Sequence, residues 1–177
     1  MTLPVSDLVP VDVDDLFVYP VKSCGAVRVD ELLFDETGHV VGDREWIVVD
    51  ESSRAVWLGS HPRLVLVRPR FQGDQLLLQG PGEDRVEIES NASLVPHRVY
   101  MWNDVTLKEE AFLGLDAGVA AAEFLRRVVG QPLRLIRLGR DGIGRDGVRS
   151  VHLVSRESLD ELSMELAAGG APLVDLG

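Results

Sequence analysis

Short alternations of hydrophobic and polar positions fill the first half of the chain. Seven stretches rich in β-branched, leucine and aromatic residues are predicted as strands, at residues 15–19, 26–35, 44–50, 55–58, 64–68, 75–79 and 85–89. Turn-forming Gly, Asp and Pro residues separate them, for example at 72–74 and 80–84. This spacing is typical of an antiparallel sheet, sandwich or barrel. Residues 98–102 and 105–109 predict one more hairpin around Asn103-Asp104, a pair that tolerates positive φ.

From about residue 116 the period becomes helical. Apolar side chains recur every three or four positions, at Val119, Ala122, Leu125, Val128 and Val129. Gly130 stands where a C-terminal cap is expected and Pro132 follows it, so a helix over 116–129 is predicted. A strand at 133–138, a Gly- and Arg-rich loop at 139–150, a short strand at 151–154 and a second helix from Ser155 to about 168 complete the prediction.

Length and composition indicate a globular protein. With 177 residues, 45% of them hydrophobic, the chain can bury a core as one domain, or as one domain plus part of another. The formal net charge of −11 argues against nucleic acid or an anionic membrane as a partner. The sequence has neither a signal-peptide pattern nor an apolar run of about 20 residues. We therefore expect a soluble, cytoplasmic protein.

The segment 19–25, Tyr-Pro-Val-Lys-Ser-Cys-Gly, carries the first candidate chemistry. It ends an apolar strand with the cation of Lys22, the hydroxyl of Ser23 and, at Gly25, a residue that lets backbone approach closely. This combination suits an anionic ligand, for example one that carries a phosphate, although a purely structural turn explains it nearly as well. Arg44 follows Gly-Asp about twenty residues later; its guanidinium could pair with Asp43 in a surface ion pair, the commoner arrangement, or bind a phosphate.

Arginines cluster in one window of this acidic chain. Seven lie close together, at Arg126, Arg127, Arg134, Arg137, Arg140, Arg145 and Arg149. The loop within this window could wrap an anion or be merely solvated, and it has neither a Walker A nor a dinucleotide pattern. Ser155 is predicted to cap the second helix, where free N–H groups could also attract an anion.

Cysteine and histidine give weaker indications. Cys24 is the single cysteine, which excludes an intrachain disulfide. No sequence feature supplies it with a base, so a small packed residue is the simpler interpretation. The four histidines lie far apart without metal-ligand spacing.

Three motifs together resemble the N-terminal β-barrel domain of MOSC proteins. They are LFVYPVKSC at 16–24, GDREWIVVD at 42–50 and HPRLVLV at 61–67. Further along, DAGVAAAEFL at 116–125, GQPLRL at 130–135 and VHLVSRESL at 151–159 look like the lead-in to the MOSC domain itself. The resemblance implies a mainly β fold, with an antiparallel barrel domain over 12–130 and a partial α/β MOSC segment with two helices over 131–177. We expect the chain to stop inside that second domain.

The family includes amidoxime-reducing components and the C-terminal region of molybdenum-cofactor sulfurases. The resemblance implies a molybdopterin site in which Lys22, Ser23, Arg44, Val154 and Ser155 contact the cofactor. In the reductases, molybdenum held by the pterin dithiolene and one cysteine thiolate removes oxygen from N-hydroxylated substrates, with electrons delivered by separate redox proteins. At the level of the family, pyridoxal phosphate binding is a further expectation.

The metal-ligating cysteine of the reductases has no counterpart among these residues. Cys24 belongs to the Lys-Ser-Cys motif and does not match it. We therefore predict the cofactor-binding part of a molybdenum-dependent oxidoreductase, inactive by itself. The alternatives are a non-enzymatic module that binds a pterin, a phosphate or a partner, part of a sulfurase-type protein, and a structural barrel that docks onto a partner.

Overall fold

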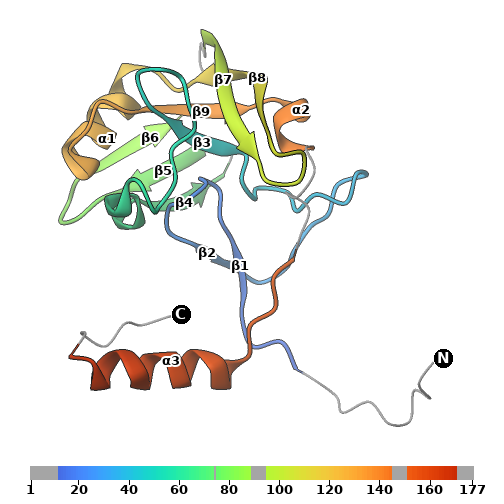
Figure 1. The fold of residues 1–177 in the computed structure, drawn as a ribbon, viewed down its shortest axis with the longest axis vertical. Coiled ribbons are helices and arrows are strands. Elements are labelled where there is room, and N and C mark those ends of the chain that lie inside the picture. The colour runs from blue at the N-terminus through green and yellow to red at the C-terminus, as the bar shows by residue number, and fades with distance from the viewer. Residues whose placement is uncertain (1–11, 74, 89–94, 145–150, 171–177) are drawn as a thin grey trace.

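The computed structural model describes residues 12–73, 75–88, 95–144 and 151–170. Within these ranges, nine strands form three antiparallel sheets, ordered β1-β2, β3-β9-β8-β7 and β4-β5-β6. Helix α1 lies against this β body, whereas helix α3 lies apart from it (Figure 1). The predicted mainly β fold with antiparallel sheets and two helices is confirmed.

The four-stranded sheet contains the most buried of the described strands. It consists of β3 (Trp46–Val49), β9 (Arg134–Leu138), β8 (Lys108–Asp116) and β7 (Val95–Asn103). All four side chains of β3 are buried, as their β-branched and aromatic composition predicts. The predicted hairpin is confirmed, but its turn runs to Leu107, so the second strand starts at Lys108 and not at 105. Asn103 Oδ1 accepts the Val105 N–H at 2.9 Å and the Thr106 N–H at 3.2 Å, which closes the turn.

Two smaller sheets complete the β structure of the described residues. One pairs β1 (Leu16–Val18) with β2 (Val27–Val29), and the other contains β4 (Arg68–Gln72), β5 (Gln75–Gln79) and β6 (Arg85–Ile88). Alternate side chains of β5 are buried. This is the pattern of a strand with one face against the core.

Helix α1 (Val119–Val129) closes one side of the main core. Its buried side chains are Ala121, Phe124, Leu125, Val128 and Val129. Full burial of a large apolar side chain contributes about 1.5–3 kcal/mol, so this face fixes the helix. Gly130 has φ 88° and donates its N–H to the Arg126 carbonyl, which confirms the predicted C-cap.

Three predicted strands are wrong, and a fourth, predicted at 26–35, is confined to β2. Residues 64–68 are predicted as a strand, but the 3₁₀ helix η2 (Pro62–Leu66) occupies most of them and β4 starts at Arg68. Pro62 has a φ suited to a helical first turn, and Leu64 is the buried side chain of η2. The stretch 55–58 makes only an isolated bridge between Val49 and Ala55, and 151–154 is exposed and unpaired. Within the predicted loop at 139–150, α2 (Arg140–Ile143) forms one helical turn.

Helix α3 (Arg156–Ala168) is held by its cap and by ion pairs. Ser155 Oγ accepts the Ser158 N–H at 3.1 Å, which confirms the predicted cap. None of its residues is buried. Arg156 bonds Asp15 at 2.6 Å and lies 3.7 Å from Asp14, just before β1. None of the helices in the described ranges has the length and apolar character needed to cross a bilayer.

Candidate functional site

The two candidate motifs lie side by side although some twenty residues separate them. The Arg44 N–H donates to the Tyr19 carbonyl at 2.7 Å, the Trp46 N–H to Pro20 at 3.0 Å and the Lys22 N–H to Trp46 at 2.9 Å. These bonds fix the backbone of the Lys22 turn against the start of β3. The structure therefore brings the segments of Lys22, Ser23 and Arg44 together.

Asp43 connects the two motifs through its side chain. Its Oδ1 accepts the Tyr19 N–H at 2.7 Å, and its Oδ2 accepts Arg44 Nη1 at 2.6 Å. Asp43 is buried, whereas the Arg44 side chain is 31% exposed. The expected Asp43–Arg44 ion pair is present. Because this pair uses one edge of the guanidinium, the remaining N–H groups can still donate to a ligand.

Ser23 and Arg44 share an uncommon backbone conformation. Their φ angles are 69° and 52°, in the left-handed region that few residues other than glycine adopt. Such conformations cost of order 1–3 kcal/mol each and persist where the surroundings enforce them, often at ligand sites. Here the hydrogen bonds to Tyr19 and Trp46 supply that enforcement.

Cys24 and Gly25 face the protein interior. Cys24 belongs to the main hydrophobic core, and burial raises the pKa of its thiol to about 12. The interpretation as a packed residue is confirmed. The Gly25 N–H donates to the Val67 carbonyl at 2.9 Å, and a Cβ on Gly25 would lie 3.3 Å from that oxygen. The close approach predicted for Gly25 is thus to the chain before β4.

Val154 and Ser155 lie elsewhere. Val154 is 64% exposed, and Ser155 is the exposed N-cap of α3. Helix α3 lies well away from β3, which begins two residues after Arg44 (Figure 1). The structure does not gather these two residues with Lys22, and their cofactor contacts stay predictions.

Three arginines of the cluster form separate ion pairs. Arg127 makes two bonds with Asp84, Arg134 binds Asp116, and Arg137 lies 3.4 Å from Glu45. The bond with Arg127 lowers the pKa of Asp84. Each of these arginines is matched by a carboxylate on another element rather than directed at a shared anion. Arg145 and Arg149 lie outside the described residues.

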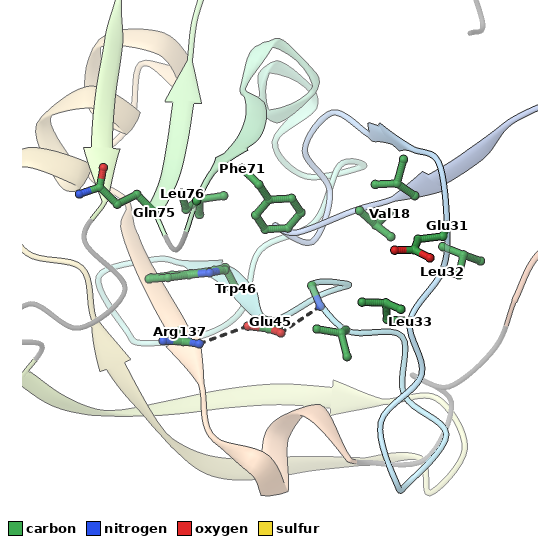
Figure 2. Close-up of a pocket in the computed structure, with 14 residues that line it drawn as sticks. Val18, Glu31, Leu32, Leu33, Glu45, Trp46, Phe71, Gln75, Leu76 and Arg137 are labelled. Atoms are coloured by element: carbon green, nitrogen blue, oxygen red, sulfur yellow. Dashed lines mark hydrogen bonds and ion pairs between the residues drawn. The ribbon is translucent and has the colours of Figure 1, made fainter.

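A cavity of about 490 Å³ lies between the three sheets, and the sequence did not predict it. Its walls come from β1, β2, the 31–42 loop, the β4–β5 hairpin and β9 (Figure 2). Gly42, Glu45 and Trp46 line it, whereas Lys22, Ser23 and Arg44 do not. The cavity therefore lies beside the candidate anion site but is distinct from it.

Ser53, His97 and Asp116 form a row with the residue types of a hydrolase triad. Ser53 Oγ is 3.0 Å from His97 Nε2, but His97 Nδ1 is 3.9 Å from Asp116 Oδ2, too far for a hydrogen bond. The backbone N–H groups of residues 52–54 all donate to Asp50, so this turn offers no oxyanion donor. The Ser53–His97 bond holds the turn against β7.

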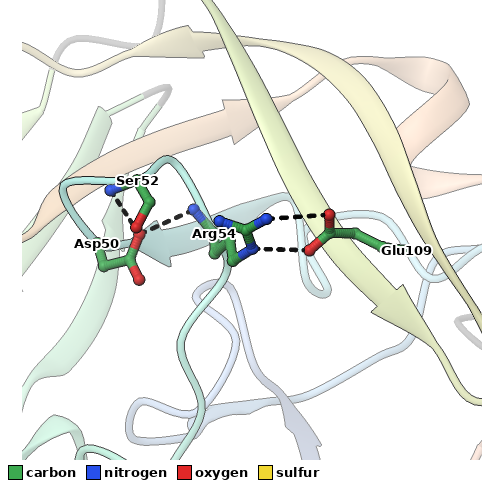
Figure 3. A network of polar contacts seen from close by, with 4 residues as sticks. All are labelled: Asp50, Ser52, Arg54 and Glu109. Carbon is green, nitrogen blue, oxygen red and sulfur yellow. Dashed lines mark hydrogen bonds and ion pairs between the residues drawn. The ribbon is translucent and has the colours of Figure 1, made fainter.

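The same turn is fixed to β8 by a second set of polar contacts (Figure 3). Arg54 Nε and Nη2 donate to the two oxygens of Glu109 at 2.8 and 3.3 Å, and this contact raises the pKa of Arg54. Asp50 accepts the N–H groups of Ser52 and Arg54. These donors all find acceptors within the protein, so we assign this network a structural role.

Metal-binding geometry is absent from the described part of the chain. Within these residues, no three His, Cys, Asp or Glu side chains are grouped so that they could hold a metal ion.

Known proteins resemble this chain in sequence and in fold. The sequence profile of the family described as MOSC N-terminal beta barrel domain matches residues 11–132. Mitochondrial amidoxime-reducing component 1 of Xenopus laevis is 35% identical over 140 residues, which cover 73% of this chain and 38% of that protein. Molybdenum cofactor sulfurase of Danio rerio is 28% identical over 130 residues, covering 70% and 15%.

A solved structure shares the fold. The solution structure of a protein from Bordetella bronchiseptica superposes with a TM-score of 0.52 at 21% identity, covering 69% of this chain and 87% of that one. This chain spans less than two fifths of the two curated relatives, at 38% and 15% of their lengths.

Proposed function

Because this chain belongs to the MOSC N-terminal beta barrel domain family, we propose that Lys22, Ser23 and Arg44 bind the anionic end of molybdopterin. The observation that carries the proposal is the pairing of the two segments, with Ser23 and Arg44 both in left-handed conformations. The relatives are named for the molybdenum cofactor or for amidoxime reduction. The resemblance inferred from the motifs is correct at the level of the family.

The residues fit the anionic end of this cofactor. Lys22 contributes a positive charge, Ser23 a hydroxyl donor, and Arg44 the guanidinium edge that Asp43 does not use. Asp43 orients Arg44 and partly offsets its charge, so Lys22 supplies the remaining attraction for a phosphate. In a protein with a net charge of −11, such a locally basic turn is selective for an anion held at short range.

The metal end would need a ligand from elsewhere. Cys24 is buried in the core with a raised pKa, so its thiolate is disfavoured and it faces away from any ligand at the surface. When bound, the cofactor supplies oxygen-removing redox chemistry, which we propose acts on N-hydroxylated substrates with electrons from a redox partner protein. The role of this chain is to bind and orient the cofactor.

Val154 and Ser155 stay proposed contacts. The first N–H groups of α3 can attract an anion, and Ser155 already uses its hydroxyl to cap Ser158. A cofactor bound there would have to share this cap. A cytoplasmic location and pyridoxal phosphate binding likewise stay predictions.

A non-enzymatic binding module is the second candidate. The family profile covers residues 11–132, which carry the Lys22 turn and Arg44. Among the described residues of the chain, no cluster of His, Cys, Asp or Glu could hold a metal ion. In this alternative the chain holds a pterin phosphate and performs no redox step. Because this chain is expected to be inactive by itself, an amidoxime-reduction assay of a chain extended past Gly177, with NADH and an electron-donor protein, separates the two: only the oxidoreductase turns over substrate.

Retention of the cofactor by purified protein tests the proposal. The chain is co-expressed with the enzymes of molybdopterin synthesis, and bound pterin is measured by fluorescence after oxidation. We expect Lys22→Ala and Arg44→Ala each to reduce retained pterin at least tenfold, which corresponds to about 1.4 kcal/mol. Lys108, an exposed residue at the start of β8, is the other lysine of the chain, and Lys108→Ala is the matched control. Equal retention by all variants would contradict the assignment.

A further inference from the structure

The cavity beside β3 has mainly apolar walls. Its apolar lining comes from several elements: Val18, Val29, Leu32, Leu33, Phe71 and Leu76. The Trp46 ring forms another wall, and the Phe71 ring lies against Gly42, where a Cβ would come within 2.9 Å of it (Figure 2). A volume of about 490 Å³ with apolar and aromatic walls falls in the range of small-molecule sites.

The lining of this cavity carries more negative than positive charge. Glu45 and Glu31 contribute carboxylates, and Arg137 contributes the one cation of the lining. Glu45 Oε1 accepts the Gly42 N–H at 3.0 Å, and its Oε2 lies 3.4 Å from Arg137. Arg137 also stacks over Trp46 at 5.8 Å. Its charge is therefore matched by Glu45.

Glu31 supplies the excess negative charge. Among the described residues it makes no hydrogen bond or ion pair, and it lies at the end of the cavity opposite Arg137 (Figure 2). A cation that enters this space is attracted by Glu31 and by the remaining lone pairs of Glu45. An anion is repelled by Glu31, because the charge of Arg137 is already matched by Glu45.

From this arrangement we infer that the cavity is a second binding site, selective for a small aromatic ammonium ion. The ring packs on Phe71 and Trp46, and the ammonium group lies between Glu31 and Glu45. This site goes beyond the proposed function, since none of its lining residues belongs to the Lys22, Ser23 and Arg44 set.

Fluorescence of Trp46 tests the inference directly. Trp57 and Trp102 are exposed, so the double variant Trp57→Phe and Trp102→Phe leaves Trp46 as the single tryptophan. Phenethylamine and phenylacetate are the probes, because they share a ring and differ in charge. We expect saturable quenching by phenethylamine, with an affinity at least tenfold higher than that of phenylacetate.

Two further variants decide the outcome. Glu31 lies on an exposed loop, so its substitution should not lower thermal stability. In the same background, Glu31→Gln should weaken phenethylamine binding at least threefold. Lys22→Ala should leave that binding unchanged, even though it lowers pterin retention under the proposed function. Equal affinity for both probes, no saturable quenching, or an unaltered affinity in Glu31→Gln would each overturn the inference.

Discussion

The backbone N–H of Tyr19 donates to Asp43 Oδ1 at 2.7 Å, across 24 positions of the chain. The other oxygen of the same buried carboxylate accepts Arg44 Nη1 at 2.6 Å. One side chain therefore fixes the entry to the Lys22 turn and aims the guanidinium of Arg44. A defect at Asp43 should consequently affect stability and anion binding together.

Asp43→Ala is expected to lower the free energy of unfolding by about 1–3 kcal/mol, because it leaves the Tyr19 N–H without its partner. Asp43→Asn keeps an acceptor for Tyr19 but removes the charge that faces Arg44, so its effect on stability should be smaller. Urea unfolding measures both, and Asp104→Ala, at an exposed turn, serves as the control. An effect of Asp43→Ala no larger than the control would contradict the bridging role.

Gly42 tests the contact with Phe71. Gly42 has φ 85°, and an added Cβ would lie 2.9 Å from the Phe71 ring. Gly38 has φ 79° with nothing within 4 Å, so Gly38→Ala measures the backbone cost alone, about 1–2 kcal/mol. We expect Gly42→Ala to cost more than Gly38→Ala. The difference should shrink in a Phe71→Ala background, and a difference that persists there would show that the ring is not its cause.

Much of this fold could be predicted from local pattern. The buried strand β3, helix α1 with its Gly130 cap and the Asn103 hairpin each follow from composition and turn chemistry that act within a few residues. The strand predicted at 64–68 was wrong because Pro62 favours the helical turn of η2. The apolar run alone resembles a strand.

The site could be predicted only in part. The motifs of Lys22 and Arg44 marked it, but their pairing depends on hydrogen bonds between distant segments. The ion pairs within the arginine cluster could not be predicted, because the carboxylates involved are remote in sequence. Arg127 pairs with Asp84, and Arg134 pairs with Asp116. The cavity is built from three sheets at once, so no single stretch of sequence carries its pattern.

Replacing His39 is expected not to destabilise the folded protein. The side chain is buried, and neither ring nitrogen has a hydrogen-bond partner among the residues that the structure describes. Leaving a buried polar group unpaired costs about 1–3 kcal/mol. His39→Leu removes that cost and keeps the backbone N–H that donates to Asp35. We expect thermal unfolding at an unchanged or higher temperature, and a clear decrease would indicate that the ring makes a stabilising contact.

Cys24 gives a prediction on pH. Burial raises the pKa of its thiol to about 12, from 9.0 for the model compound. Between these values the unfolded chain releases the thiol proton while the folded chain retains it. The contribution of Cys24 to stability is thus complete below about pH 9 and is lost as pH rises toward 12, at up to about 1.4 kcal/mol per pH unit. Urea unfolding of wild type and Cys24→Ala across this range isolates it, because the other titrating groups are shared. We expect the stability difference between the two to narrow or reverse as pH rises.

In the native protein at pH 8 a thiol reagent should label Cys24 at the rate of unfolding, and rapid labelling of folded protein would contradict its burial.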